Sequence, residues 1–285
     1  NTSIKEENSL DIRLIKYIIA ARNFLQKEQI EVGYQILEKA RIVATEHQLF
    51  SILNEIYHTK IQYAHQHKTL NLEEIIDHFK ENQQQLIQED NLNIAYAKIR
   101  KSLNEYQQKK TTIDIKKLIE STLKEQNNLD ISLLSFKSLY QLLQITTISS
   151  SQKFDYNITN FAVDTYKIVK NHTSKNKQTF YHIEILYVIS NIFFRDKKFN
   201  QSLKYLELMN FYMQENKQKY LKEFSSKHDL LLALNYNYTE KQEEAIQLLE
   251  NCIDKKNSNI VQNLDIYLSL IVCYFQHKKL TKAQS

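Results

Sequence analysis

The chain has 285 residues, of which 42% are hydrophobic and 25% are charged, and its formal net charge is +5. One glycine and no proline exclude folds rich in β-hairpins and strained loops, because such folds depend on these two residues. The composition therefore predicts an all-α protein, and the small net charge does not require a nucleic acid or a membrane as partner.

The first part of the chain predicts three consecutive helices, the first two of which form a hairpin. Residues 1–8 are polar and predict a frayed end, with Ser9 as N-cap of the first helix. Apolar residues then recur at i, i+3, i+4 and i+7, which predicts helices at about 9–27, 29–46 and 47–66. Phe24 and Gly33 lie nine residues apart across the first turn, so we expect the glycine at a close approach of two helices.

The middle of the chain predicts helices with less regular spacing. They are expected at about 71–88, 91–108, 112–126, 130–148 and 157–170. The first two form either separate helices or one bent rod. Asn71 and Asp130 are the expected caps. The longest polar connection, 146–155, has no glycine or proline, so we expect one continuous array rather than two linked domains.

The last hundred residues show the clearest pattern. Helices are expected at about 177–195, 198–215, 217–238, 240–254 and 258–277, with a further start at Thr281. A nine-residue gap separates an aromatic residue from a small one three times: Phe193–Ser202, Tyr236–Ala245 and Tyr274–Ala283. The small side chain allows two helices to approach and the aromatic fills the space beside it. Ala245 is therefore expected to be buried between its two helices.

This pattern resembles the tetratricopeptide repeat (TPR), in which an aromatic ends one helix and an alanine lies early in the next. The resemblance implies a right-handed α-α superhelix, a solenoid of about six or seven helical hairpins that forms a single domain over 1–285. The repeats are clearest in 10–66 and 177–285 and are irregular in 67–176. The spacing between successive small residues, 43 and then 38, exceeds the usual period of ~34.

The ends of the chain predict a fragment of a longer protein. The sequence starts at Asn1 rather than Met, and it stops at Ser285, a few residues into a predicted helix. Val272, Tyr274 and Phe275 lie on a helix whose partner would follow that end. We therefore expect their apolar face to be exposed or covered by another molecule.

In the tetratricopeptide family, the first helix of each hairpin lines a concave surface that holds a peptide. The resemblance therefore implies a peptide groove made by Tyr187, Asn191, Phe194, Arg195, Leu234, Asn237 and Tyr238. Asn191 stands where relatives that hold peptide termini use asparagine to bind the ligand backbone. Tyr187 stands where those relatives carry a lysine for the terminal carboxylate.

Several kinds of chemistry are excluded by the residues. Phosphate-binding loops need several glycines, and neither a nucleophile elbow, a His-Glu-x-x-His helix nor a Cys-x-x-Cys pair is present. His58 and His65 are seven residues apart, whereas metal ligands on one helix usually lie at i and i+4. Cys252 and Cys273 are expected to be buried free thiols. The sequence predicts no enzyme, no cofactor and no metal.

The expected function is a protein-interaction scaffold that binds a peptide or a partner helix in the groove. The alternative is a regulatory or sensor module of a larger signalling or transcription-regulating protein, with its output domain outside this chain. Basic residues gather between Lys98 and Lys117, but solvated helix faces commonly carry such charge, so nucleic acid is not the expected partner.

No membrane span and no signal peptide are predicted. The sequence does not determine the oligomeric state or the location, for which the cytoplasm is favoured.

Overall fold

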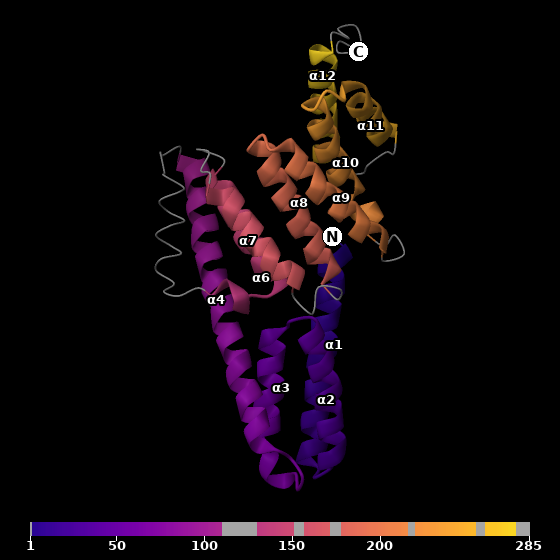
Figure 1. The fold of residues 1–285 in the computed structure, drawn as a ribbon. Coiled ribbons are helices and arrows are strands. Elements are labelled where there is room, and N and C mark those ends of the chain that lie inside the picture. Colours follow the sequence, from indigo (N-terminus) through magenta and orange to yellow (C-terminus); the bar gives the residue numbers. More distant parts are fainter. Residues whose placement is uncertain are drawn as a thin grey trace. The chain divides into compact units, whose positions relative to one another are not determined.

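The computed structural model describes residues 2–109, 130–150, 157–171, 178–215, 220–254 and 260–277. Within these ranges the regular structure is entirely helical, which confirms the all-α prediction for the described residues (Figure 1). The chain forms two compact units. The first comprises Asn1–Leu142 and Ile168–Gln178, and the second comprises Leu143–Lys167 and Thr179–Ser285. The single solenoid domain of the sequence analysis stays a prediction.

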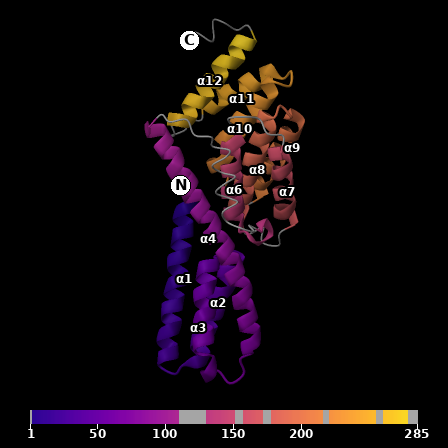
Figure 2. The ribbon, with the colours of Figure 1, turned by 90° about the vertical axis from the view of Figure 1, so that its left-hand side faces the viewer.

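The first unit is built on four helices that follow one another along the chain. They are α1 (Thr2–Gln26), α2 (Ile30–Glu46), α3 (Phe50–Gln62) and the long α4 (Leu72–Lys109), and Figures 1 and 2 show them side by side. Each packs against the next, and α1 also contacts α3. Fully buried leucine and isoleucine side chains form the core, among them Leu14, Leu37 and Ile56. Two short 3-10 turns, Ala64–Gln66 and Ile131–Leu133, flank α4.

The second unit contains five helices in a continuous series. They are α8 (Thr179–Arg195), α9 (Phe199–Glu215), α10 (Leu221–Asn237), α11 (Gln242–Asp254) and α12 (Ile260–Gln276). Each helix packs against the next, and α10 also contacts α8 and α12. Leu206, Phe224 and Leu249 are fully buried in its two apolar clusters. The remaining helices, α6 (Phe136–Ser150) and α7 (Asn157–Asn171), each contribute residues to both units.

A single kind of turn joins helices at four places. Its central residue is left-handed, with φ between 53° and 63°: Glu28, Gln48, Lys197 and Glu240. The N–H after this residue donates to the carbonyl five residues back, as Lys198 does to Phe193 (2.9 Å) and Lys241 does to Tyr236 (3.1 Å). This is the Schellman arrangement, which usually places glycine at the left-handed position. Here Lys, Glu and Gln occupy it, so the chain forms tight hairpins without glycine.

Small residues on facing helices allow the close approach that the nine-residue spacing predicted. Ser202 Oγ donates to the Ser190 carbonyl at 2.8 Å, and both residues are fully buried. A Cβ on Gly33 would lie 2.6 Å from Leu25 Cγ, so only glycine fits there without a shift. Ala245 is fully buried, as predicted. Each of these residues has a small partner twelve positions earlier, a spacing that the sequence analysis did not use: Ala21–Gly33, Ser190–Ser202 and Ala233–Ala245.

The helix starts differ from the predictions at two points. α1 is already helical at Thr2, so Ser9 lies inside the helix and does not cap it. Asp130 caps the short 3-10 turn rather than the following helix: its carboxylate accepts from the Ser132 N–H at 2.9 Å. Ser135 caps α6 instead, because its Oγ accepts from the Ser138 N–H at 3.2 Å. Asn71 does cap α4, accepting from the Glu74 N–H at 3.4 Å.

Of the two alternatives for this part of the chain, the structure has the single rod rather than two separate helices, because 72–109 form one helix. The polar residues that suggested a break bind the next segment of the chain instead. Glu89 accepts hydrogen bonds from Ser135 (2.6 Å) and Ser138 (2.8 Å). The connection expected over 146–155 is partly helical, since α6 continues to Ser150. The predicted helices at 112–126 and from Thr281 lie outside the described residues.

Candidate functional site

The predicted groove residues lie on two neighbouring helices of the second unit. Four are on α8, two are on α10, and Tyr238 directly follows α10: Tyr187, Asn191, Phe194, Arg195, Leu234, Asn237 and Tyr238. α8 and α10 contact each other. Arg195 is exposed, and 52% of Tyr238 is exposed. Tyr187, Asn191, Phe194 and Leu234 are half-buried, so six of the seven remain accessible to some degree.

Three aromatic rings meet where α8, α9 and α10 come together. Tyr238 stacks on Phe199 with ring centroids 5.4 Å apart and an interplanar angle of 5°. Phe194 lies against both rings, at 5.8 Å from Phe199 and 5.9 Å from Tyr238. Phe194, Phe199 and Tyr238 are called the aromatic cluster below. Phe199 was not predicted, because it begins a second helix of a hairpin, whereas the resemblance pointed only to first helices.

Three basic residues lie between Phe194 and Phe199 in the sequence. Arg195 follows Phe194 directly, and Lys197 occupies the left-handed position of the adjoining turn, and both are exposed. Lys198 is paired with Asp196, with Nζ and Oδ2 2.7 Å apart. Arg195 and Lys197 therefore place positive charge within a few residues of Phe194 and Phe199 along the chain, a combination suited to an acidic ligand with an apolar side chain.

Near the start of α8, an ion pair joins this helix to α10. Lys227 Nζ lies 2.9 Å from Glu184 Oε1, and only 8% of the Glu184 side chain is exposed. The same ammonium lies 5.7 Å from the centre of the Tyr187 ring. Burial raises the pKa of the Tyr187 hydroxyl, the charge of Glu184 adds to this effect, and the charge of Arg195 opposes it. These contacts hold α8 against α10, and they use part of the surface that Tyr187 was expected to offer a ligand.

The predicted accessibility of Asn237 is wrong, because this residue is buried and is not exposed to a ligand. Its Nδ2 donates a hydrogen bond to Gln276 Oε1 on α12. The side chain therefore joins two helices of the unit through its amide nitrogen. Sequence reasoning could not find this bond, because its two residues are separated by 39 positions.

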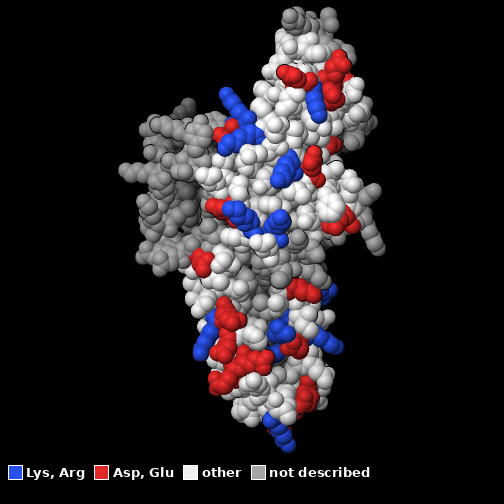
Figure 3. Space-filling view, viewed as in Figure 1, with Lys and Arg blue, Asp and Glu red and all other residues white. Residues whose placement is uncertain are grey.

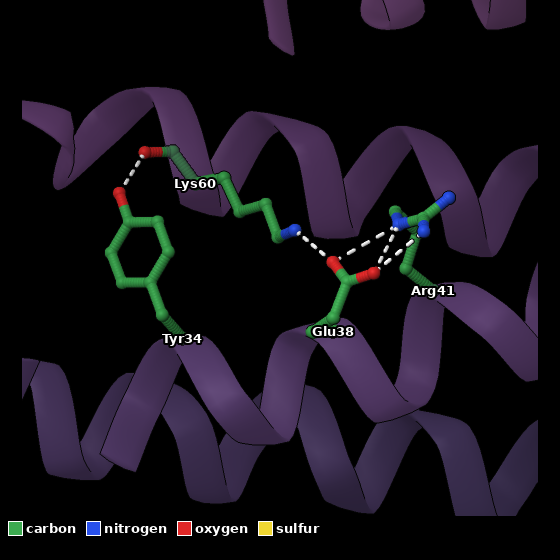
Figure 4. A network of polar contacts seen from close by, with 4 residues as sticks. All are labelled: Tyr34, Glu38, Arg41 and Lys60. Carbon is green, nitrogen blue, oxygen red and sulfur yellow. Dashed lines mark hydrogen bonds and ion pairs between the residues drawn. The ribbon is translucent and has the colours of Figure 1, made fainter. Parts of the chain in front are cut away.

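A network of polar side chains joins α2 and α3 in the first unit (Figure 4). Glu38 accepts hydrogen bonds from Arg41 Nε and Nη2 and pairs with Lys60 Nζ at 2.6 Å. The hydrogen bonds from Arg41 and Lys60 lower the pKa of the Glu38 carboxyl to about 2. Tyr34 donates to the Lys60 carbonyl at 2.5 Å. Both cations bind the one carboxylate, so this group explains how the helices are joined.

Other kinds of site find no support among the described residues. They contain no group of three or more His, Cys, Asp or Glu that could hold a metal ion. None of the described helices is both long and apolar enough for a membrane span. On the face of the second unit seen in Figure 3, basic and acidic side chains are interspersed. The aromatic cluster with Arg195 is therefore the candidate site.

Comparisons of the chain with protein-family models, curated proteins and solved structures gave no match.

Proposed function

We propose that this chain is a TPR-like right-handed solenoid of about six or seven helical hairpins, which binds a segment of another protein. The serial packing of each helix on the next supports this proposal, as does the contact of α10 with both α8 and α12. Those three would be the first helices of consecutive hairpins. Stacked hairpins bring first helices side by side and create an extended binding surface.

The observation that carries the proposal is the aromatic cluster, whose Phe194 directly precedes the exposed Arg195 on α8. Aromatic side chains bury a large rigid surface at a low entropic cost, which makes them frequent anchors at interfaces. A guanidinium binds a carboxylate through two parallel hydrogen bonds. The ligand is therefore a peptide or helix with an apolar side chain close to an acidic residue. The apolar side chain contacts Tyr238, and the carboxylate meets Arg195.

The test has two steps. Partners are first isolated with the wild-type chain from its source, and peptides covering the isolated partners are then titrated against purified protein. Arg195→Ala and Tyr238→Ala are each expected to weaken binding by at least ~1 kcal/mol, which is about fivefold. Both residues are exposed, so the helical circular-dichroism signal should remain that of the wild type.

The matched control is the pair Lys204→Ala and Phe211→Ala. Both residues are exposed, and they lie on α9 outside the aromatic cluster. This pair should leave peptide affinity unchanged. Substituting lysine for the acidic residue of the peptide should weaken binding to the wild type more than to Arg195→Ala. Equal binding of the same peptides by wild type and by the Arg195→Ala/Tyr238→Ala double variant would refute the proposal.

A further inference from the structure

Helix α12 is apolar on two sides, and among the described residues only one of these sides is buried. Ile266, Leu270 and Cys273 are buried against the neighbouring helices. Six large apolar residues on the other side are between 38% and 57% exposed: Leu264, Tyr267, Leu268, Ile271, Val272 and Phe275. These six residues are called the α12 stripe. Tyr274, which was expected on this exposed face, is instead buried, and its hydroxyl donates to Glu250 Oε1 at 2.5 Å.

The spacing of the α12 stripe is that of a core-facing helix surface. Its residues follow i, i+3, i+4, i+7, i+8 and i+11, which is the pattern by which a helix buries one side against another helix. Leu264, Leu268, Ile271 and Phe275 alone recur at intervals of four, three and four, as in the seam of a helix pair. A helix that is apolar on both sides is expected to be covered on both.

We propose that the α12 stripe pairs with the α12 stripe of a second copy of this chain, so that two copies form a homodimer. A two-fold interface brings the same patch of both copies together, so the patch must be complementary to itself. The stripe contains no charged residue, so two copies meet without like-charge repulsion. The six residues themselves offer no charge that would select a partner of opposite charge.

The size of the stripe is sufficient for such a dimer. Six side chains that each lose on the order of 100 Å² would bury about 600 Å² on each copy and about 1,200 Å² in total. A specific interface needs roughly 1,000 Å². The dimer is therefore expected to be reversible, because interfaces near this lower limit of size are typical of transient complexes. This proposal does not depend on peptide binding, because the aromatic cluster and the α12 stripe share no residue.

The experiment is sedimentation equilibrium of the full chain over a range of protein concentrations. Wild type is expected to change from monomer to dimer as its concentration rises. Leu268→Glu places two carboxylates in the interface and should weaken dimerisation at least about tenfold. Phe211→Glu is the matched control: Phe211 on α9 is 55% exposed, against 52% for Leu268, and lies outside the stripe. It should dimerise like wild type.

A mixture of Leu268→Glu and Leu268→Lys adds a test that does not depend on loss of signal. Opposite charges meet only in the mixed dimer, so the mixture should dimerise more tightly than either variant alone. Circular dichroism first confirms that both variants are helical, and Val272→Glu replaces Leu268→Glu if that variant does not fold. A wild-type chain that stays monomeric at every concentration would overturn the proposal. Undiminished dimerisation of the glutamate variant would overturn it as well.

Discussion

Four residues of this chain adopt a left-handed backbone that glycine would adopt at lower cost. Glu28, Gln48, Lys197 and Glu240 have φ near 60°, and each lies in the turn between two helices. For a residue with a Cβ, this conformation costs roughly 1–2 kcal/mol. Hydrogen bonds that close the helix end offset the cost, such as the bond from the Lys241 N–H to the Tyr236 carbonyl. The hairpins therefore persist with strained central residues.

Glu240→Gly is expected to stabilise the protein by up to ~1 kcal/mol. Glycine removes the steric cost at φ 63°, although its greater freedom in the unfolded chain cancels part of the gain. The measurement is the free energy of unfolding from urea denaturation. Glu244→Gly provides the control, because Glu244 is exposed inside α11 and glycine there should cost about 1 kcal/mol. Equal destabilisation by both substitutions would show that the turn is not strained.

The candidate site shows which residues sequence reasoning can and cannot place. Arg195 and Tyr238 were predicted to be accessible, and both are. Arg195 is the last residue of α8, and Tyr238 directly follows α10. Asn237 was also predicted to be accessible, but it is bonded to Gln276 on a helix that lies farther along the chain. Long-range pairing of this kind leaves no signal in local periodicity.

At the scale of helices, short-range patterns predicted the hairpins well. The nine-residue spacing correctly placed the turns after Phe24, Phe193 and Tyr236, because each turn is closed by backbone bonds within a few residues. The same approach could not decide whether 72–109 is one helix or two. Glu89 lies within α4, and its carboxylate accepts hydrogen bonds from Ser135 and Ser138 of a later segment. The hydrogen bonds to this later segment explain why a polar residue lies in the middle of a continuous helix.

The pairing of α2 with α3 depends on the ionised form of Glu38. Its pKa in the folded chain is about 2, against an ordinary value of 4.5. A lowered pKa in the folded state means that the ionised carboxyl stabilises the fold above about pH 4.5. This stabilisation is lost as the pH falls toward 2. The Glu38 side chain is 43% exposed, so solvent screening keeps the effect modest.

Glu38→Gln is therefore expected to lower stability at neutral pH, where Lys60 would lose its carboxylate partner. Only 8% of the Lys60 side chain is exposed, and a buried charge without a partner is destabilising. The variant should also lose less stability than wild type between pH 4.5 and pH 2. The measurement is the urea midpoint across this pH range, with the exposed Glu73→Gln as control. A constant difference between wild type and Glu38→Gln at every pH would contradict this account.

At the scale of the whole molecule, each compact unit contains an apolar cluster of its own. Leu37 is fully buried in the cluster formed by α1, α2, α3 and α4, and Leu249 is fully buried in the cluster formed by α10, α11 and α12. In repeat proteins each helical pair contacts only its neighbours, so stability is approximately a sum of local terms. A single globular core would instead spread the effect of any core substitution over the whole chain.

Leu37→Ala distinguishes these two behaviours. Removing a buried leucine side chain costs about 2–5 kcal/mol. If stability is local, hydrogen exchange should become faster in α1, α2 and α3, while the amides of α8 to α11 keep their protection. Leu249→Ala is the reciprocal variant and should give the opposite pattern. Equal loss of protection in both units for either variant would show one cooperative fold and would count against the proposed solenoid. Local loss in both variants would mean that a ligand bound beside Arg195 stabilises the second unit without protecting α1 to α3.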